Sequence, residues 1–289
     1  MTRSSPGHNP SPDAAANVGI RITVVVPTYG TRGGMLLRAL KSIDPHRRDD
    51  LEVLVVDDCT PDESVRDVAT LAGATYVRRP TNGGVAAAQQ LGVEKAQGRY
   101  VVFLHSDDEM AEARTWSVLP NGIVVGALSY GPDVQGPHSL SMDGLIWHHY
   151  GVHISACTFD RQLLVAHPFD STLRSWEDWD LLFRLAISKV PISLVDEVFA
   201  YIEVTGIDRL SATPAMALAL PYIYCKHAQY ICANRQLRAL WEFKMARLSL
   251  RAGARPVGYT WLARSLLRDP LHPRRWNVAA KSLKNPESA

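Results

Sequence analysis

The stretch Tyr100-Val-Val-Phe-Leu-His-Ser-Asp-Asp-Glu109 passes from five apolar residues to three consecutive acidic ones. The apolar part is typical of a buried strand. Asp107 and Asp108 would follow the end of that strand, where adjacent carboxylates repel each other unless a cation binds between them and a ligand. Aspartate is also a good helix N-cap, so a purely structural role stays open for this stretch taken alone.

Buried-strand and helical patterns alternate upstream of this stretch. Strands are predicted at residues 20–27, 51–56, 74–78 and 100–104, and helices at 31–43, 61–72 and 84–96. Thr60 is the expected N-cap of the second helix, with Pro61 at its first position. The alternation predicts right-handed crossovers and an α/β, Rossmann-like fold, in which helices cover both faces of a mostly parallel sheet.

Polar residues stand at the ends of three of the predicted strands. They are Pro27-Thr28-Tyr29, Asp57-Asp58 and Asp107-Asp108. In open parallel sheets, ligands bind beyond the carboxyl ends of the strands, so all three groups would line one crevice. Two unrelated helix caps would not need carboxylate pairs at two strand ends, and the metal-site interpretation is therefore favoured.

The pattern becomes less regular after Glu109. Strands are predicted at residues 122–128 and 192–202, a long loop at 131–147 and a helix at 175–187. Residues 215–267 are predicted to be largely helical, ending at Pro270 and Pro273. Residues 1–19 are rich in Ser, Pro, Ala, Asn and Gly and are expected to form a disordered leader.

Charge is unevenly distributed along the chain, although the net charge of +2 gives no global field that would attract nucleic acid. Residues 234–289 carry twelve Lys and Arg against three Asp and Glu, whereas the first 233 residues carry 19 against 26. The basic C-terminal part is either a solvated helical face or a contact to a membrane surface or an oligomer partner. The four cysteines lack metal-binding spacing, and no transmembrane helix is predicted, so we expect a cytoplasmic protein, or one peripheral to the inner membrane face.

Several of these motifs, in this order, resemble those of family 2 glycosyltransferases with the GT-A fold. The matching residues are Val24-Val-Val-Pro-Thr-Tyr29, Val55-Val-Asp-Asp58, Asn82-Gly-Gly84 with Ala88, Gln90, Gly92 and Gly98, Phe103-Leu-His-Ser-Asp-Asp108, and Trp176-Glu-Asp-Trp-Asp-Leu181 with Arg184. The resemblance implies a catalytic domain at 20–211, with a nucleotide-binding half at 20–110 and an acceptor half at 111–211. Residues 212–289 would then form a basic helical C-terminal extension.

The resemblance implies a nucleotide-diphosphate-sugar donor, linked to UDP or dTDP. It assigns the following residues to donor binding: Pro27, Thr28, Tyr29, Asp58, Asn82, Gly84 and Asp107. A carboxylate at Asp58 suits this role because it can accept the N3–H of a uracil or thymine ring. Asp57 is expected to be structural.

The family's metal signature is Asp-x-Asp, and this chain departs from it because His105 occupies the first position. Asp107 and Asp108 are the expected ligands of Mn²⁺ or Mg²⁺, and His105 is a third candidate that could instead pack or hydrogen-bond. The cation would neutralise charge on the leaving nucleoside diphosphate. Histidine cannot supply the negative charge of the aspartate that it replaces.

The resemblance also assigns the catalytic base to Asp178, with Glu177 beside it, which implies a single displacement with inversion. Asp180 is expected to support the site, pairing with Arg184. Trp147, His153 and Trp176 are candidate contacts to a small-molecule, lipid-linked or glycan acceptor. Two other functions stay open: a catalytically inactive protein that binds nucleotide sugars, and a nucleotidyltransferase, although no glycine-rich phosphate loop with a lysine follows the first strand.

Overall fold

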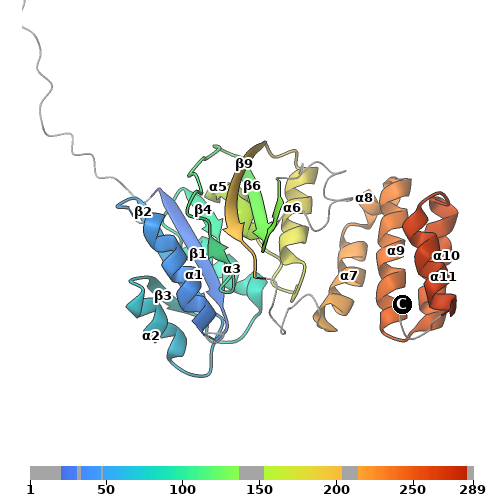
Figure 1. Ribbon diagram of the computed structural model, residues 1–289, viewed down its shortest axis with the longest axis horizontal. Helices are drawn as coiled ribbons and strands as arrows, with labels where there is room; N and C mark the ends of the chain where they lie inside the picture. The colour runs from blue at the N-terminus through green and yellow to red at the C-terminus, as the bar shows by residue number, and fades with distance from the viewer. Residues whose placement is uncertain (1–20, 31–33, 47, 137–152, 204–213, 285–289) are drawn as a thin grey trace, which may run out of the picture.

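The computed structural model describes residues 21–30, 34–46, 48–136, 153–203 and 214–284. Figure 1 shows a sheet flanked by helices, with a group of C-terminal helices beside it. The leader expected at 1–19 and the loop around Trp147 lie outside the described residues. No helix in the described ranges is both long and apolar enough to cross a bilayer.

The N-terminal half forms the parallel sheet that the alternating patterns predict. Its strands lie in the order β3-β2-β1-β4 and all pair in parallel. They are β1 (Ile22–Thr28), β2 (Leu51–Asp57), β3 (Thr75–Arg78) and β4 (Tyr100–Phe103). Thr28 lies opposite Asp57, and Val25 lies opposite Phe103. This register brings the carboxyl ends of β1, β2 and β4 to one edge of the sheet, as expected.

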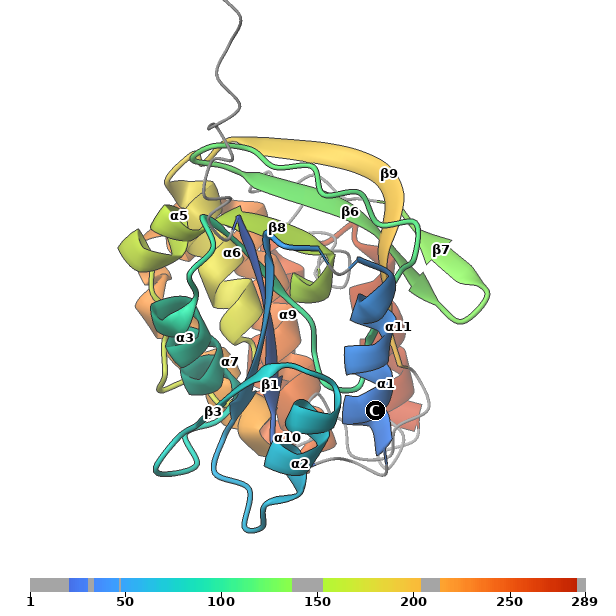
Figure 2. The ribbon, with the colours of Figure 1, turned by 90° about the vertical axis from the view of Figure 1, so that its left-hand side faces the viewer.

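Helices cover both faces of these strands because the strand residues are apolar on both sides. Val25 packs on one face with α3 (Val85–Lys95), α5 (Arg161–Ala166) and α6 (Glu177–Ile187). Val24 and Val26 pack on the other face with α1 (Met35–Ile43) and α2 (Ser64–Leu71). Figure 2 shows α3 and α6 on one side of β1 and α1 on the other. Burial of each such valine or leucine contributes about 1.5–3 kcal/mol to folding.

The second half of the sheet is mixed, which the sequence patterns did not reveal. Strand β8 (Cys157–Asp160) pairs antiparallel to β4, and β6 (Ile123–Tyr130) pairs antiparallel to β8. Strand β9 (Ile192–Tyr201) runs parallel to β6 and antiparallel to the short β5 (Glu109–Met110), while β7 (Asp133–Gln135) pairs with β6. The described strands thus join in one sheet. Strand β8 escaped prediction because four residues are too few to carry a periodicity.

Two predicted helix boundaries are wrong. Helix α2 begins at Ser64 rather than Pro61, because both the backbone N–H and the hydroxyl of Thr60 donate to Asp57 Oδ1 and hold a tight turn after β2. Pro273 begins helix α11 (Pro273–Lys284) instead of ending the helical region. Proline suits a first helical turn, where its missing N–H has no partner to lose. Helix α1 begins at Met35, and the residues predicted to precede it lie partly outside the described ranges.

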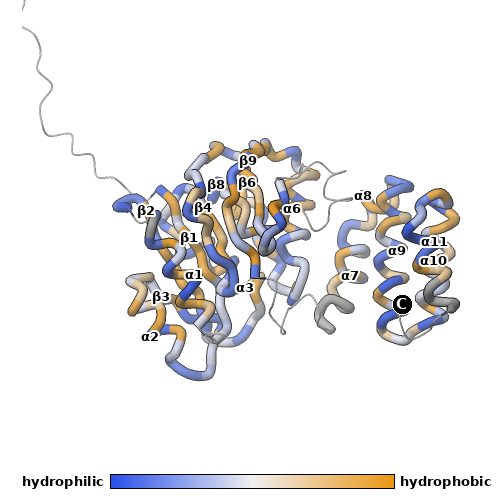
Figure 3. The backbone as a smooth tube through the Cα atoms, in the orientation of Figure 1, coloured by the Kyte–Doolittle hydropathy of each residue, from blue (hydrophilic) through white to orange (hydrophobic). Residues whose placement is uncertain are grey.

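The C-terminal helices pack on the start of α6 through tryptophan side chains. They are α7 (Pro214–Lys226), α8 (Ala228–Ala233), α9 (Arg235–Arg251), α10 (Arg255–Arg268) and α11. Trp176 and Trp179 at the start of α6 lie in one apolar cluster with Trp241 of α9. Figure 3 shows hydrophilic segments alternating with hydrophobic ones along α9. Arg238 and Arg268 both pair with the buried Glu242, so part of the basic charge is neutralised within the helices.

Candidate active site

Asp57 and Asp58, at the end of β2, have different surroundings. Asp57 is fully buried and accepts hydrogen bonds from Thr60 and from the Tyr76 hydroxyl, at 2.8 Å. Burial and the hydrogen bond to Asp57 raise the pKa of Tyr76. These contacts give Asp57 the structural place expected for it.

Asp58 holds the loop that contains Asn82 and Gly84. Its Oδ1 accepts from the backbone N–H of Gly83 at 2.9 Å and from Arg79 Nη1 at 2.5 Å, and its Oδ2 accepts from the N–H of Gly84 at 2.6 Å. Gly84 has φ +83°, a left-handed conformation that a side chain would strain. Oδ2 accepts one hydrogen bond in the described part of the chain, whereas an ionised carboxyl oxygen can accept two.

The first strand end presents a tyrosine to solvent. Pro27 and Thr28 belong to β1 and are buried, and the Thr28 hydroxyl donates to the carbonyl of Gly30 at 2.7 Å. Tyr29 follows them and its side chain is half exposed, at 50%. The amide N–H of Asp58 donates to the carbonyl of Thr28, so the two strand ends are tied together.

Arg174 joins the two halves of the site, and sequence reasoning missed it. Its Nη1 donates to Asn82 Oδ1 at 3.0 Å, and its Cδ would lie 2.9 Å from a Cβ placed on Gly84. The residue is exposed and lies two positions before Trp176. Its position just before the Trp-Glu-Asp motif was the only signal in the sequence. A side chain at Gly84 would therefore meet both backbone strain and this arginine.

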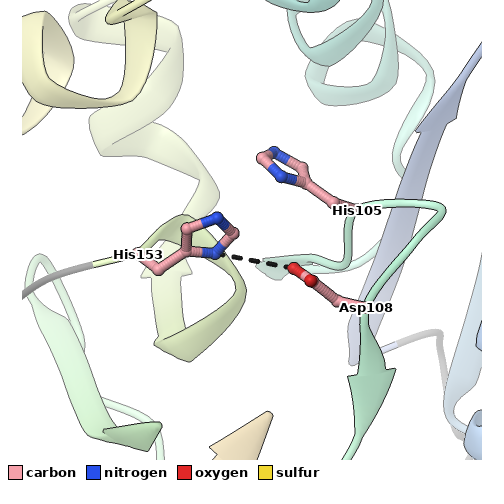
Figure 4. A group of neighbouring side chains, drawn as sticks. All are labelled: His105, Asp108 and His153. Atoms are coloured by element: carbon pink, nitrogen blue, oxygen red, sulfur yellow. Dashed lines mark ion pairs between the residues drawn. The ribbon is translucent and has the colours of Figure 1, made fainter. Parts of the chain in front are cut away.

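Near the end of β4, three side chains bring together atoms that could bind a metal ion. His105, Asp108 and His153 each offer one nitrogen or oxygen atom, and these atoms lie within 4.8 Å of one another. Figure 4 shows the three side chains gathered in one place, with His153 facing Asp108. Of the expected ligands, Asp108 and His105 belong to this group and Asp107 does not. His153, expected to contact the acceptor, occupies the remaining place.

Burial and charge shift the pKa values of these groups in opposite directions. Burial raises the pKa of Asp108 to about 6, and the neighbouring Asp107 acts in the same direction. Burial lowers the pKa of His105, and His153 lowers it further. The negative charges of Asp107, Asp108 and Asp178 each raise the pKa of His105. Asp178 therefore lies close enough to His105 to interact with it electrostatically.

Asp178 lies in the first turn of α6. Its side chain is half-buried, and its Oδ1 accepts from the backbone N–H of Trp179 at 2.6 Å. The preceding Trp176 is the helix N-cap and has φ +69°. This conformation turns the chain sharply into the helix, and Asp178 lies close enough to His105, beyond the end of β4, to influence its pKa. Burial raises the pKa of the Cys157 thiol to about 12, and the nearby negative charge of Asp178 acts in the same direction.

Two of the expected acceptor contacts do not gain support. The indole of Trp176 is only 9% exposed, because it packs near Trp179 and Trp241 and under the ammonium group of Lys244. Little of the ring is left to stack on an acceptor, so we do not keep Trp176 in that role. Trp147 lies outside the described residues.

Asp180 has the expected contact to Arg184 and two further partners from the C-terminal helices. Its carboxylate accepts from Arg184 Nε at 2.9 Å, from Lys226 Nζ at 2.9 Å and contacts His227 Nε2 at 2.7 Å. Burial alone would raise the pKa of Asp180, but the hydrogen bonds from His227 and Lys226 hold it below its usual value. The network fixes α6 against α7 and α8.

Arg114 is a second residue that sequence reasoning missed. It is buried and donates to the carbonyls of Ser155 and Cys157 and to the Thr158 hydroxyl. Burial lowers its pKa to about 9. Because Ser155 Oγ donates to Asp108 Oδ2 at 2.9 Å, Arg114 indirectly fixes Asp108. No local pattern marks this arginine, since its partners lie 41 to 44 residues away in the chain.

Glu177 is predicted to make the protein less stable as the pH rises. Burial raises its pKa from the ordinary value of 4.5 to about 8, and the Asp178 carboxylate adds to the shift. Between these values the folded protein binds more protons at Glu177 than the unfolded chain does. The free energy of unfolding should therefore fall with rising pH, by at most about 1.4 kcal/mol per pH unit from this group. Glu177→Gln should reduce this fall.

Urea unfolding at pH 5, 6, 7 and 8 measures the effect. Glu197→Gln, at an exposed position in β9, is the matched control and should follow the wild-type profile. Parallel pH profiles for Glu177→Gln and the wild-type protein would show that Glu177 is not held protonated.

Part of this chain is similar in sequence to known glycosyltransferases. A family model described as Glycosyl transferase family 2 matches residues 23–120. The succinoglycan biosynthesis protein ExoW of Rhizobium meliloti is 38% identical over 95 residues, which are 30% of this chain and 30% of ExoW. This chain thus matches only about a third of the length of such curated relatives.

Solved structures show the same fold at low sequence identity. Residues 1–349 of S. aureus TarS in complex with UDP-GlcNAc are 17% identical, with a TM-score of 0.62 over 86% of this chain and 81% of that one. The mannosyltransferase PcManGT of Pyrobaculum calidifontis, in complex with GDP-Man and Mn²⁺, is 21% identical, with a TM-score of 0.58 over 92% and 81%. Residues 23–120 of this chain are therefore similar to glycosyl transferase family 2, and the chain shares the fold of these solved glycosyltransferases.

Proposed function

We propose that this protein is an inverting glycosyltransferase that moves a sugar from a UDP- or dTDP-linked donor to an acceptor hydroxyl, with Asp178 as the general base. The observation that carries the proposal is the convergence of three acidic positions on one edge of the sheet. Asp58 holds the Asn82–Gly84 loop, and Arg174, which lies just before α6, donates a hydrogen bond to Asn82 in that loop. The charge of Asp178, in the first turn of α6, raises the pKa of His105.

The donor would lie across the ends of β1 and β2. Tyr29 offers an exposed ring for stacking, and the free acceptor position of Asp58 suits the N3–H of a uracil or thymine ring. Asn82 and Gly84 would lie beside the base or ribose, where the missing side chain of Gly84 permits close approach. Arg174, already at this loop, would add positive charge near the diphosphate.

The transfer itself needs one proton acceptor and one stabilised leaving group. Asp178 would take the proton of the acceptor hydroxyl as its oxygen forms a bond to the anomeric carbon, while the bond from that carbon to the diphosphate breaks. Attack from the side opposite the diphosphate gives inversion. A divalent cation, Mn²⁺ or Mg²⁺, would neutralise the charge that builds on the leaving diphosphate. His105, Asp108 and His153 fit a cation because their ligand atoms converge, and Asp107 adds negative charge nearby.

We assign this chemistry to residues 20–211, with the donor bound by residues 20–110 and the acceptor by residues 111–211. We assign residues 212–289 to a C-terminal extension that includes helices α7 to α11, and its basic side chains are candidate contacts to a membrane surface or another copy of the chain. The acceptor class that we propose is a small molecule, a lipid-linked sugar or a glycan. Free cysteines at 59, 157, 225 and 232 suit a reducing compartment, which supports a cytoplasmic location.

The proposal is tested by the products released from a set of donors. UDP- and dTDP-sugars are incubated with the protein, with Mn²⁺ or Mg²⁺ and candidate acceptors, and nucleoside diphosphate is measured. Release of nucleoside diphosphate with inverted product stereochemistry, followed by NMR, is the expected result. Donor binding without release in any mixture would favour the inactive binding protein. Pyrophosphate released from a nucleoside triphosphate and a sugar phosphate would favour the nucleotidyltransferase.

Asp58→Ala is expected to weaken donor binding in a protein that still folds. The change removes the acceptor of two backbone N–H groups and leaves Arg79 without its carboxylate partner, so the loop at residues 82–84 loses its anchor. We expect the Kd for UDP or dTDP, measured by calorimetry, to rise at least about tenfold, because a charged hydrogen bond is worth about 1.5–3 kcal/mol.

Asp67→Ala, at an exposed position in α2, is the matched control and should bind as the wild-type protein does. Thermal unfolding of Asp58→Ala in the absence of ligand separates loss of binding from loss of fold. An unchanged Kd in a folded Asp58→Ala protein would remove Asp58 from the donor site.

A further inference from the structure

The group formed by His105, Asp108 and His153 differs from an oxygen-only cation site, because two of its three ligand atoms are imidazole nitrogens. The rings of His105 and His153 lie edge to face with their centroids 4.8 Å apart. His153 Nδ1 lies 3.6 Å from Asp108 Oδ2. The three side chains come from the end of β4, the loop before β5 and the residue before the short 3₁₀ helix η3 (Ile154–Ala156) (Figure 4).

The contact between His153 and Asp108 brings two electron-rich atoms together. His153 Nδ1 is positioned to accept from the backbone N–H of Ser155 at 3.4 Å, and in that state it carries a lone pair rather than a proton. Asp108 Oδ2 faces the same nitrogen with negative charge. The two atoms repel each other unless a proton or a metal cation lies between them, and a metal cation there would be coordinated by both.

His105 is held in a way that leaves its other nitrogen available. Its Nε2 lies 3.4 Å from the amide nitrogen of Gln89. Gln89 is fully buried, and its Oε1 has no hydrogen-bond partner in the described part of the chain. Turned over by 180°, the Gln89 amide would present Oε1 to Nε2, accept its proton and leave the Nδ1 lone pair for a cation. Histidines that bind metals usually donate their second ring N–H to an oxygen acceptor in this way.

Asp108 is also fixed before any ligand arrives. Its Oδ2 accepts from Ser155 Oγ at 2.9 Å, and its Oδ1 accepts from the backbone N–H of Glu203 at 3.3 Å. The carbonyl of Ser155 in turn accepts from the buried Arg114. These contacts hold the ligand atoms in place from several directions, so little ordering remains to be done when a cation binds.

We propose that His105, Asp108 and His153 form a centre selective for divalent transition metals, binding Zn²⁺ and Co²⁺ most tightly, Mn²⁺ less tightly and Mg²⁺ weakly. Imidazole nitrogen is a good ligand for the transition metals, whereas Mg²⁺ prefers oxygen and keeps several of its waters. The position of the centre beside a donor diphosphate rests on the proposed function. The choice of ligands and the metal preference rest on the geometry alone.

Metal binding is measured on the full chain without nucleotide, after treatment with a chelator. Calorimetry gives the Kd for Zn²⁺, Co²⁺, Mn²⁺ and Mg²⁺, and the visible absorption of bound Co²⁺ reports its ligands. We expect the Kd for Co²⁺ to be at least tenfold lower than that for Mg²⁺. His153→Gln should raise the Kd for Co²⁺ at least tenfold. His105→Asp should lose affinity for Co²⁺ and gain affinity for Mg²⁺, because it replaces a nitrogen ligand with oxygen.

His167→Gln is the matched control, since His167 follows helix α5 and is not among the three grouped residues, and it should bind Co²⁺ as the wild-type protein does. Thermal unfolding of each variant in chelator shows whether it is folded. Equal affinity for Mg²⁺ and Co²⁺, or wild-type Co²⁺ binding in both folded histidine variants, would overturn the centre. Selective Co²⁺ binding without any sugar transfer would support the metal centre and refute the proposed function. Sugar transfer without selective Co²⁺ binding would support the proposed function and refute the metal centre.

Discussion

Asp178→Asn should bind the donor as tightly as the wild-type protein and yet lose turnover by about 10²–10⁴-fold, the usual contribution of a general base. The substitution keeps the size of the side chain and its ability to accept from the Trp179 N–H. Only the capacity to take a proton is removed. An interaction used solely in the transition state lowers kcat and leaves ground-state binding unchanged.

The measurement combines calorimetry for the donor Kd with the rate of nucleoside diphosphate release. Asp196→Asn, at an exposed position in β9, is the matched control and should leave both quantities unchanged. A fall in donor affinity as large as the fall in turnover would indicate that Asp178 binds the donor. Turnover within tenfold of the wild-type rate would assign the proton to another group.

Asp180→Ala should lower the free energy of unfolding by about 3 kcal/mol, the lower end of the range for breaking a buried ion pair. Asp180 is fully buried, and its removal leaves His227, Lys226 and Arg184 without their shared partner. The lower end applies because the side chains of Arg184 and Lys226 remain 19% and 25% exposed and can recover hydration. For a protein of this size the Tm should fall by roughly 6–12 °C.

The same substitution should lower kcat, because the network fixes α6, which carries Asp178 two residues earlier. Asp180→Asn should recover part of the stability, since its carbonyl oxygen can still accept from His227. As the folded pKa of Asp180 is depressed, its contribution is present above the ordinary pKa of 3.8 and is lost as the pH falls below it. Urea unfolding of both variants at pH 7, with Asp196→Asn as control, gives the comparison. A change below about 1 kcal/mol, typical of a surface substitution, would show that the C-terminal helices do not depend on this contact.

The strands and helices of the N-terminal half were predictable from local sequence, because each is marked by its own periodicity. Residues 53–56 of β2 are apolar on both faces of the strand and need helices on both sides of the sheet, whatever follows them in the chain. Strand β8 was not predictable in this way. Its place beside β4 depends on pairing between Val102 and Thr158, which are 56 residues apart in a stretch with no periodicity of its own.

For the candidate site too, some residues could be predicted from the sequence and others could not. Asp58, Asp108 and Asp178 could be proposed because they stand at strand ends or in a motif resembling a known family. Their partners could not. Asp58 meets Gly84 across 26 residues, Asp108 meets Ser155 across 47, and Arg174 meets Asn82 across 92. Whether a given acidic residue holds a loop, binds a cation or takes a proton depends on these distant contacts.

The sequence by itself determined that this chain forms a layered α/β sheet with acidic residues at the carboxyl ends of its strands. Local propensity and burial of apolar side chains are sufficient for that, since each element carries its own signal. Only the tertiary structure decided that His153 rather than Asp107 joins His105 and Asp108, that Arg174 reaches the Asn82–Gly84 loop, and that Asp180 connects α6 to the C-terminal helices. These contacts are short-range and directional, so they depend on where the folded backbone places residues that are far apart in the chain.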